Sequence, residues 1–327
     1  MYAKAAKAGQ ERHIMKSNGY IIGVGAANFD ISGKSLDAIK MRDSNPGRFS
    51  ISSGGVTRNI LENLSRLGVS TKLISAVGED IFGDYIISGC VSAGIETALV
   101  RRVKTASSSY AALLDDSGDM LVAMSDMRIL EAVTPRYLDS VADIILRSEA
   151  VVCDPGLPLA SLQHLLTITS DRVPVFVDPV STTYAEKLRD IAGEFRSIKP
   201  NRMELSIIAE IDINDEQGIE NACDRLLAAG TEQIIVTLGG EGCFYKDRGG
   251  TVVRRGLHSL DRMANATGGG DAFSAAVVYG YAKDLPIGET LDLALAAGIA
   301  AVSSEHTINP DMSVDLLYDI INRYKHV

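Results

Sequence analysis

Residues 55–77, GVTRNILENLSRLGVSTKLISAV, place a helix directly before a strand. Apolar residues recur at helical spacing through Thr57–Leu67, Gly68 ends that pattern, and Lys72–Val77 is an apolar run of strand length. Another apolar strand pattern, Tyr20–Ala26, precedes this unit. A strand, a helix and a second strand in that order are typical of a parallel sheet covered by helices. The stretch therefore predicts an α/β fold.

The same alternation continues toward the C-terminus. Short apolar runs predict buried strands at Ala150–Cys153, Val173–Val177 and Gln233–Leu238. Helical spacing predicts helices at Ile81–Ala93, Leu159–Thr167, Glu216–Ala229, Asp271–Lys283, Ile287–Ser304 and Val314–Tyr324. We therefore expect one domain over residues 19–327, with a mostly parallel central sheet and helices on both faces. Residues 1–18 lack the apolar core of a secretory signal and are expected to form a disordered extension.

Two segments, at about 29–52 and 99–126, carry little helix signal. The second resembles a hairpin, with strands at Ser109–Leu114 and Met120–Met124 joined by the turn sequence DDSGD. We expect the two segments to form a small β-rich lid on the α/β body. A lid that closes over a bound substrate excludes water from the site.

Composition excludes several classes of protein. The 327 residues carry a formal net charge of −10, which disfavours nucleic-acid binding because phosphate backbones require a basic face. The four cysteines form no C-x-x-C pair and the five histidines show no zinc spacing, so we expect reduced thiols and no zinc site. No apolar run reaches the length of a membrane span. We expect a cytoplasmic protein that binds small molecules, without nucleic-acid or membrane partners.

Two glycine-rich stretches resemble nucleotide motifs but are incomplete. Gly23–Asn28 (GVGAAN) ends in asparagine where a dinucleotide fingerprint has its third glycine, and the sequence after it is strand-like. Gly33–Ser35 (GKS) lacks the glycine that a P-loop has five residues earlier, and no helix pattern follows. A nicotinamide-dependent dehydrogenase and a P-loop enzyme are therefore both disfavoured.

The strongest chemical signal is NATGGGDAF at residues 265–273. Three glycines before an apolar helix leave unobstructed backbone N–H groups at the helix N-terminus, which is an anion-binding arrangement. Asp271 falls in the first turn, where it could cap the helix or act as a general base. A capping aspartate does not require three preceding glycines, so the pattern favours the base.

The TGGGDAF stretch is similar to the G-A-G-D signature of the ribokinase-like (PfkB) sugar and nucleoside kinases. Three further motifs of that family occur in the family's order: Gly54–Asn59 (GGVTRN), Lys199–Glu204 (KPNRME) and Thr237–Gly242 (TLGGEG). The resemblance extends from about residue 20 to the C-terminus. It implies a ribokinase-like three-layer α/β/α fold and a kinase that uses ATP and Mg²⁺ to phosphorylate an alcohol.

Additional stretches resemble the pseudouridine kinase branch of the family. They are DSNPG at 43–47, SSY at 108–110, SDM at 125–127, VFVDPVS at 175–181 and TINPD at 307–311. This resemblance implies phosphorylation of the ribose 5′-hydroxyl of pseudouridine, giving pseudouridine 5′-phosphate and ADP. Two alternatives stay open: a ribokinase or another nucleoside or sugar kinase of the same family, and a non-catalytic sensor of nucleosides or sugars.

The resemblance also assigns roles around the substrate. It implies that Asp271 accepts the hydroxyl proton and that the amides of the glycine loop bind the transferred phosphoryl group; that loop is Gly268, Gly269 and Gly270. The implied ribose clamp consists of Asn28, Asp30, Gly54, Gly55 and Asn59. Turn formation by the paired glycines and helix capping by the last asparagine are competing roles. The candidates for reading the base, each of which could instead shape a turn, are Asn45, Ser109 and Asp126.

Residues in the second half of the chain are implied to bind the nucleotide and the metal. The resemblance assigns ATP binding to Asn201, Thr237, Gly239, Thr267 and Asn309, although loop formation is an alternative for Gly239 and Asn309. Asn201 and Glu204 are spaced either for a capping box or for holding Mg²⁺ through water. Lys199 could neutralise phosphate or be a solvated surface lysine.

Three positions depart from the family pattern. Asn265 stands where much of the family has an aspartate that helps hold a monovalent cation, which puts dependence on K⁺ in doubt. Gly269 replaces an alanine and Thr57 replaces a smaller residue. The resemblance further implies a homodimer formed through lid strands, because exposed strand edges favour pairing between subunits.

Overall fold

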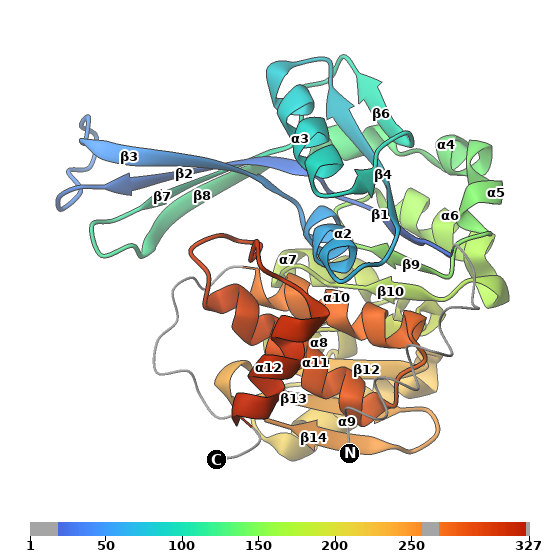
Figure 1. Ribbon diagram of the computed structural model, residues 1–327. Coiled ribbons are helices and arrows are strands. Elements are labelled where there is room, and N and C mark those ends of the chain that lie inside the picture. The colour runs from blue at the N-terminus through green and yellow to red at the C-terminus, as the bar shows by residue number, and fades with distance from the viewer. Residues whose placement is uncertain (1–18, 257–267, 325–327) are drawn as a thin grey trace.

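The computed structural model describes residues 19–256 and 268–324, so the predicted extension at 1–18 lies outside the described residues. A ten-stranded sheet runs through the body in the described part of the chain (Figure 1). Its spatial order is β14 (Val252–Arg255), β13 (Cys243–Asp247), β12 (Gln233–Thr237), β11 (Ser197–Ile198), β10 (Val175–Val177), β9 (Ala150–Cys153), β1 (Ile21–Val24), β4 (Thr71–Gly78) and β5 (Ile95–Glu96), with β6 (Val100–Val103) also paired to β4.

All pairs from β12 to β5 and β6 are parallel, and only the β12–β13 and β13–β14 pairs of this sheet are antiparallel within the described residues. Consecutive residues of β1 point into different cores: Ile21 belongs to one apolar cluster and Ile22 to the other, and both are fully buried. A strand buried on both faces explains why its sequence is apolar throughout.

Helices cover both faces of this sheet. One face is packed by α2 (Val56–Arg66), α3 (Ile81–Ser92), α10 (Gly269–Ala282), α11 (Ile287–Val302) and α12 (Val314–Tyr324). The other is packed by α4 (Pro135–Ser140), α5 (Ala142–Ile145), α6 (Leu159–Thr169), α7 (Thr182–Ala185), α8 (Arg202–Ala209) and α9 (Glu216–Ala229). The predicted three-layer α/β/α architecture is confirmed, and the helices predicted from periodicity occur with ends shifted by a few residues at most.

A second sheet projects from the body (Figure 1). Its order is β3 (Gly47–Gly54), β2 (Asn28–Ser35), β7 (Ser109–Leu114) and β8 (Met120–Asp126), so strands from both predicted lid segments lie side by side. The β2–β7 pair is parallel and the other two pairs are antiparallel. One strand of the predicted lid segment 99–126 does not belong to this sheet. That strand is β6, which pairs with β4 of the main sheet.

The two faces of the projecting sheet differ in chemistry. The register places Asp30 opposite Ser52 and Tyr110, and Tyr110 opposite Ser125, so one face is polar near the body. Phe29 points the other way and packs against Phe82 and Tyr85 of α3, with ring centroids 4.5 and 5.1 Å apart. Farther from the body, that same face carries exposed apolar side chains: Phe49, Ile51, Leu113, Val122 and Met124.

In residues 19–256 and 268–324, no helix combines the length and the apolar character that crossing a bilayer requires.

Candidate active site

The carboxyl ends of β1, β9 and β10 converge on the start of α10. Asp154 follows β9 and Asp178 follows β10, while β1 leads into Asn28 and the first strand of the projecting sheet. In open parallel sheets this end of the strands is where ligands bind. The site predicted from the glycine-rich stretch therefore lies where the fold gathers its buried carboxylates.

The backbone at the start of α10 requires glycine. Gly268 has φ of 81°, and a Cβ added there would lie 2.0 Å from the carbonyl oxygen of Thr307. A Cβ added at Gly270 would lie 3.2 Å from Nζ of Lys199, so the ammonium group closely approaches the first turn. No side chain of the described residues forms a capping hydrogen bond at this helix start. First-turn N–H groups beside a lysine ammonium form a site suited to an anion.

The departure at Gly269 has a local packing reason. A Cβ at this position would lie 3.0 Å from Cγ1 of Val302, a side chain of α11. An alanine would therefore require Val302 to move. The close packing of α11 against this position is a structural reason for the glycine.

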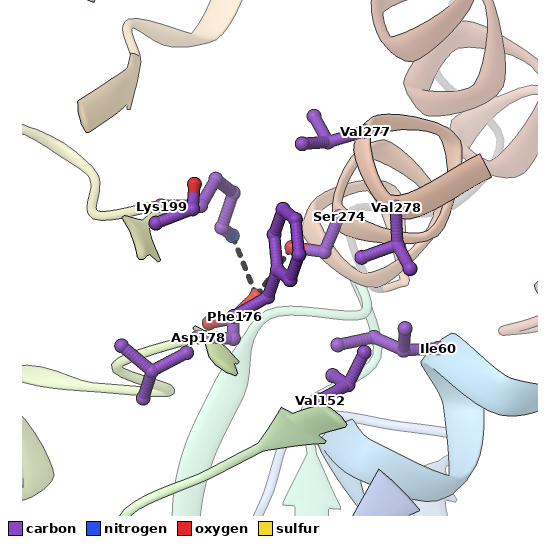
Figure 2. A pocket seen from close by; sticks show the side chains of 10 residues that line it. Ile60, Val152, Phe176, Asp178, Lys199, Ser274, Val277 and Val278 are labelled. Atoms are coloured by element: carbon purple, nitrogen blue, oxygen red, sulfur yellow. Dashed lines mark hydrogen bonds and ion pairs between the residues drawn. The ribbon is translucent and has the colours of Figure 1, made fainter. Parts of the chain in front are cut away.

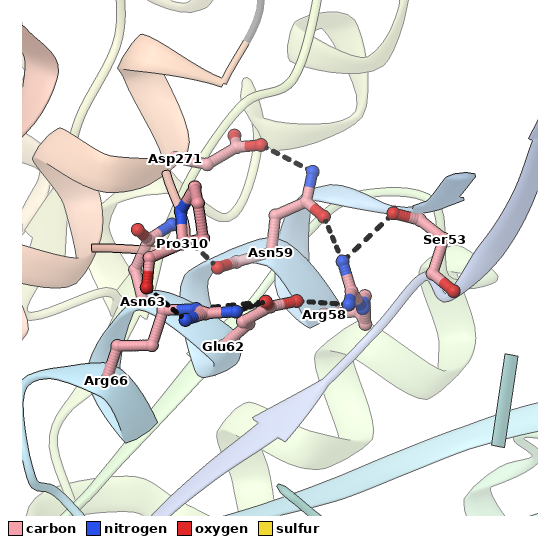
Figure 3. A network of polar contacts seen from close by, with 8 residues as sticks. All are labelled: Ser53, Arg58, Asn59, Glu62, Asn63, Arg66, Asp271 and Pro310. Carbon is pink, nitrogen blue, oxygen red and sulfur yellow. Dashed lines mark hydrogen bonds and ion pairs between the residues drawn. The ribbon is translucent and has the colours of Figure 1, made fainter. Parts of the chain in front are cut away.

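Asp271 is held at this helix start by a side chain from α2. Asn59 Nδ2 donates to Oδ2 of Asp271 over 2.8 Å (Figure 3). Burial raises the pKa of Asp271 to about 7, the charges of Asp178 and Asp154 add to the increase, and Asn59 and Lys199 oppose it. A carboxyl group that titrates near neutral pH is suited to accept a proton from a hydroxyl during a reaction.

Lys199 is a buried, paired lysine and not the solvated surface lysine that was one of its two expected roles. Its Nζ lies 2.8 Å from Oδ2 of Asp178, and Ser274 Oγ donates to the same oxygen over 2.8 Å (Figure 2). Burial alone lowers the pKa of Lys199, but Asp178 foremost, with Glu204 and Asp271, outweighs it, so the pKa is raised. The lysine therefore carries a positive charge beside the glycine loop. These three residues also line the polar end of a small, otherwise largely apolar cavity (Figure 2).

A second buried carboxylate ties the surrounding strands together. Asp154 Oδ2 accepts hydrogen bonds from the amide of Ala26 over 2.8 Å and from Oγ1 of Thr57 over 2.5 Å. The hydroxyl in this contact belongs to Thr57, which stands where the family pattern has a smaller residue. A Cβ at Gly25 would lie 2.3 Å from the same carboxylate oxygen. The glycines that resemble a dinucleotide fingerprint thus make room for Asp154 and for side chains of α2.

The predicted ribose clamp residues lie together at the base of the projecting sheet. Asn28 and Asp30 point to one face of β2, and a Cβ added at Gly54 would lie 1.9 Å from Oδ2 of Asp30. Gly55 has φ of 96°, so both glycines are required by conformation or by close approach. The Oδ1 atoms of Asn28 and Asp30 are buried and accept no hydrogen bond from the described residues.

Those two acceptors suit a ligand that carries hydroxyl groups. Buried polar atoms without partners cost free energy, which a donor supplied by a ligand recovers. Burial also raises the pKa of Asp30 to about 6, partly opposed by the charge of Arg58. At neutral pH the carboxyl group is therefore mainly an acceptor.

The three expected base-reading residues are not brought together at this site. Ser109 pairs with Phe29 and with Asp126 in the sheet register, which turns both side chains to the face opposite Asp30. Arg128 lies 2.6 Å from Asp126 and lowers its pKa to about 2. Asn45 lies in the turn between β2 and β3, where its side chain bonds to the backbone of Lys40. Asn45 thus stabilises a turn, and Asp126 forms an ion pair at the surface.

The register identifies other side chains on the face of Asp30. Tyr110 and Ser125 each lie one residue from a predicted position and share that face. Alternation along a strand could have selected them from the sequence only if the pairing partner of each strand had been known.

The start of α8 has the geometry of a capping box. Asn201 Oδ1 accepts from the amide of Glu204, and Glu204 Oε2 accepts from the amide of Asn201, each over 2.9 Å. Burial raises the pKa of Glu204. The capping box occupies one carboxylate oxygen of Glu204. A role of both residues with Mg²⁺ stays a prediction.

The remaining nucleotide candidates lie at the end of β12, just after it, and in the segment that follows α11. Asn201 and Thr237 form a parallel bridge, and Gly239 has φ of 60° with nothing within 4 Å of an added Cβ. Asn309 uses its amide within its loop, donating to Ala300 O over 2.7 Å and accepting from the Asp311 amide over 2.9 Å. Thr267 and Asn265 lie outside the described residues.

Comparison with known proteins places this geometry in a family. The family model for pfkB family carbohydrate kinases matches residues 18–314. The pseudouridine kinase of Escherichia coli (strain K12) is 33% identical over 305 residues, covering 92% of this chain and 96% of the relative. A carbohydrate kinase from Agrobacterium tumefaciens has a TM-score of 0.79 at 26% identity, with 93% of this chain and 97% of the other covered.

Ribokinase of Arabidopsis thaliana, solved with ribose and ATP, has a TM-score of 0.83 at 20% identity, with 93% of this chain and 99% of the other covered. That similarity supports the fold, while the matched family model and the relative above 30% identity support the family. The glycine start of α10 and the carboxylate beside it are the features expected of such an enzyme. The chain therefore belongs to the pfkB family of carbohydrate kinases and is a phosphotransferase that acts on a hydroxyl group.

Proposed function

We propose that this protein transfers the γ-phosphoryl group of ATP to the ribose 5′-hydroxyl of pseudouridine, giving pseudouridine 5′-phosphate and ADP. The observation that carries the proposal is the position of Asp271, held by Asn59 at an uncapped helix start. The similarity to a pseudouridine kinase over 92% of the chain supports this substrate among those of the family.

In this proposal the ribose is oriented by the acceptors at the base of the projecting sheet. Its hydroxyl groups donate to the unpartnered oxygens of Asn28 and Asp30. The close approach at Gly54 and Gly55 lets the sugar lie against backbone. Fixing the sugar in this way removes much of the entropic cost of bringing the 5′-oxygen to the phosphoryl group.

The chemical step needs one base and one anion site. Asp271 accepts the proton as the 5′-oxygen forms its bond to the γ-phosphorus, and the bond from that phosphorus to the bridging oxygen of ADP breaks. The N–H groups of the glycine loop and the ammonium of Lys199 stabilise the negative charge on the transferred group. The sheet that carries Asp30 excludes water from the site when it closes.

A magnesium ion fits the acidic side of this site only through water and phosphate. Among residues 19–256 and 268–324, no group of three or more His, Cys, Asp or Glu side chains could hold a metal directly. Mg²⁺ commonly keeps several waters and binds through one or two carboxylates plus substrate phosphates, so Glu204 with Asn201 would hold it in that manner. The ion, when bound, offsets charge on the phosphoryl oxygens. Asn265 provides no carboxylate at the position where much of the family has one for a monovalent cation, so we do not include K⁺ in the proposal.

Recognition of pseudouridine over uridine requires an acceptor for its additional ring N–H. On the face of Asp30, Tyr110 and Ser125 have hydroxyl groups that could serve, and we propose them in place of Ser109 and Asp126. The unpartnered oxygens of Asn28 and Asp30, however, belong to the proposed ribose clamp, so they support binding of a sugar and not recognition of a base. Ribose or another nucleoside is for that reason the second candidate substrate.

We also propose that the protein forms a homodimer through the projecting sheets. Phe49 and Met124 are each 74% exposed on its apolar face, and Ile51 is 54% exposed. An apolar face of this kind on a four-stranded sheet is matched by an identical face on a second copy. Light scattering should give a dimer for the wild type and a monomer for Met124→Glu, whereas a dimeric Met124→Glu would contradict this interface.

The substrate proposal is tested by a panel of acceptors with ATP and Mg²⁺. We expect the highest kcat/KM with pseudouridine, followed by uridine and ribose, with phosphorylated products separated by chromatography. Turnover of ribose without turnover of pseudouridine would overturn the substrate but leave the family assignment intact. Tight binding of pseudouridine with no product at high protein concentration would instead favour a sensor.

A further inference from the structure

A buried arginine sits beside the asparagine that holds Asp271. Arg58 lies in the first turns of α2 with its side chain only 6% exposed. Its Nη1 donates to Oδ1 of Asn59 over 3.0 Å and to the carbonyl oxygen of Ser53 over 2.9 Å (Figure 3). Ser53 belongs to β3, so one nitrogen joins the projecting sheet to the residue that contacts Asp271.

The chemistry of the guanidinium group determines which way the Asn59 amide points. Arginine has only donors, so the atom of Asn59 that faces Arg58 must be the oxygen. The NH₂ group then faces Asp271 and donates to its carboxylate. If the amide were rotated by half a turn, its oxygen would face Asp271, and that carboxyl group would have to keep its proton to make a hydrogen bond.

The position of Arg58 is itself fixed by further contacts in the same network. Its Nη2 pairs with Glu62, and Glu62 also accepts from Arg66 Nη2 over 2.8 Å. Arg66 Nη1 donates to the carbonyl oxygen of Pro310 over 2.7 Å (Figure 3). A buried charge without partners is costly, so this pairing explains how an arginine is kept inside the protein.

We propose that Arg58 is a positioning residue for the phosphoryl transfer: it holds the Asn59 amide with its NH₂ group toward Asp271 and links that orientation to strand β3. The proposal rests on the proposed function only in treating Asp271 as the base. Because the same nitrogen of Arg58 serves Ser53 and Asn59, a displacement of β3 is transmitted to the carboxylate that receives the proton.

The charged groups that face Asp271 from other elements are Asp178 after β10, Asp154 after β9 and Lys199 before α8. None of them contacts Arg58, so replacement of Arg58 leaves them in place. The charge of Arg58 also lowers the pKa of Asp30. A shift in the pH profile of the rate would therefore not show whether Asp30 or Asp271 had changed. The titration of Asp271 has to be measured directly.

The experiment measures the pKa of Asp271 by ¹³C NMR of labelled aspartate carboxyl groups, with the signal assigned from the Asp271→Asn spectrum. We expect Arg58→Met to raise this pKa by about one unit and to lower kcat by about 10-fold, the amount that one unit corresponds to at a fixed pH below the pKa. Arg58→Lys should restore part of both. Arg66→Met, which removes a partner of Glu62 but no contact of Asn59, should change the pKa of Asp271 far less than Arg58→Met.

A second comparison separates positioning from a general structural effect. Asn59→Ala should raise the pKa of Asp271 by itself, and adding Arg58→Met to Asn59→Ala should then change little, because the two residues act in series. An unchanged pKa of Asp271 in folded Arg58→Met, or full additivity in the double variant, would overturn the proposal. A wild-type protein without kinase activity would refute the proposed function instead, and the NMR titration would still decide the role of Arg58.

Discussion

Helices α8 and α10 both begin near Lys199, and their first turns are built in different ways. At α8 the side chains of Asn201 and Glu204 satisfy the backbone reciprocally. At α10 the cap is Gly268, which offers no side chain, and the first turn remains accessible from the lysine side. The free N–H groups of a helix start must be satisfied by something. The protein itself completes the start of α8, and our proposed function assigns the start of α10 to a bound phosphoryl group.

The largest expected effect concerns the carboxylate at α10. Asp271→Ala should leave a folded protein and lower kcat by about 10²- to 10⁴-fold, the usual contribution of a general base. The measurement is steady-state phosphorylation of pseudouridine, with circular dichroism to verify folding. Near-normal turnover in this variant would remove the assignment of Asp271 as the general base.

The next effect tests whether α10 needs its bare backbone. Gly268→Ala should reduce both stability and kcat, because a left-handed conformation costs an alanine about 1–2 kcal/mol and the new Cβ meets Thr307. Gly240→Ala is the matched control, since nothing lies within 4 Å of a Cβ at that position. Denaturant unfolding and kinetics should separate the two variants, and equal behaviour would argue against a built anion site.

The third test asks whether the start of α8 does more than cap a helix. Glu204→Gln keeps a side chain that can complete the capping box but removes its charge. We expect unfolding free energy to change by less than about 1 kcal/mol, whereas the Mg²⁺ concentration for half-maximal rate should rise several-fold. An unaltered Mg²⁺ requirement would mean that Glu204 acts only in the capping box.

The last test concerns the pH dependence of stability. The folded pKa of Asp271 is raised from 3.8 to about 7, so the native state binds a proton that the unfolded state releases between these values. Its contribution to the free energy of unfolding therefore falls as pH rises from about 4 to about 7. Asp271→Asn should lack this decline in pH-dependent denaturant unfolding. In the wild type, kcat/KM should rise over the upper part of the same range as the base ionises.

Several of these features were predictable from the sequence because they depend on local patterns. The glycines at 268–270, the helix periodicity of α2 and the apolar strands each act through neighbouring residues. The pairing of Lys199 with Asp178 was not predictable, since it joins positions whose proximity arises only when β10 and β11 lie side by side. An Asp-Pro after each of two buried strands was the available signal for Asp154 and Asp178.

The register of the projecting sheet explains why the predicted base-reading residues Ser109 and Asp126 do not share a face with Asp30. Ser109 and Tyr110 have almost the same sequence context, but a one-residue difference along a strand reverses the face. The parallel pairing of β2 with β7 joins segments far apart in the chain, and no local pattern specifies it. Arg58 was likewise missed, because its role depends on the positions of both Ser53 and Asn59.

The antiparallel hairpin β13–β14 has a consequence for assembly. It ends the parallel sheet with a short strand whose Arg254 pairs with Glu216 over 2.6 Å and lies 3.6 Å from Glu241. Charged, short border strands discourage the stacking of one molecule onto the next through main-chain hydrogen bonds. Open-ended fibre growth from this margin is thereby disfavoured.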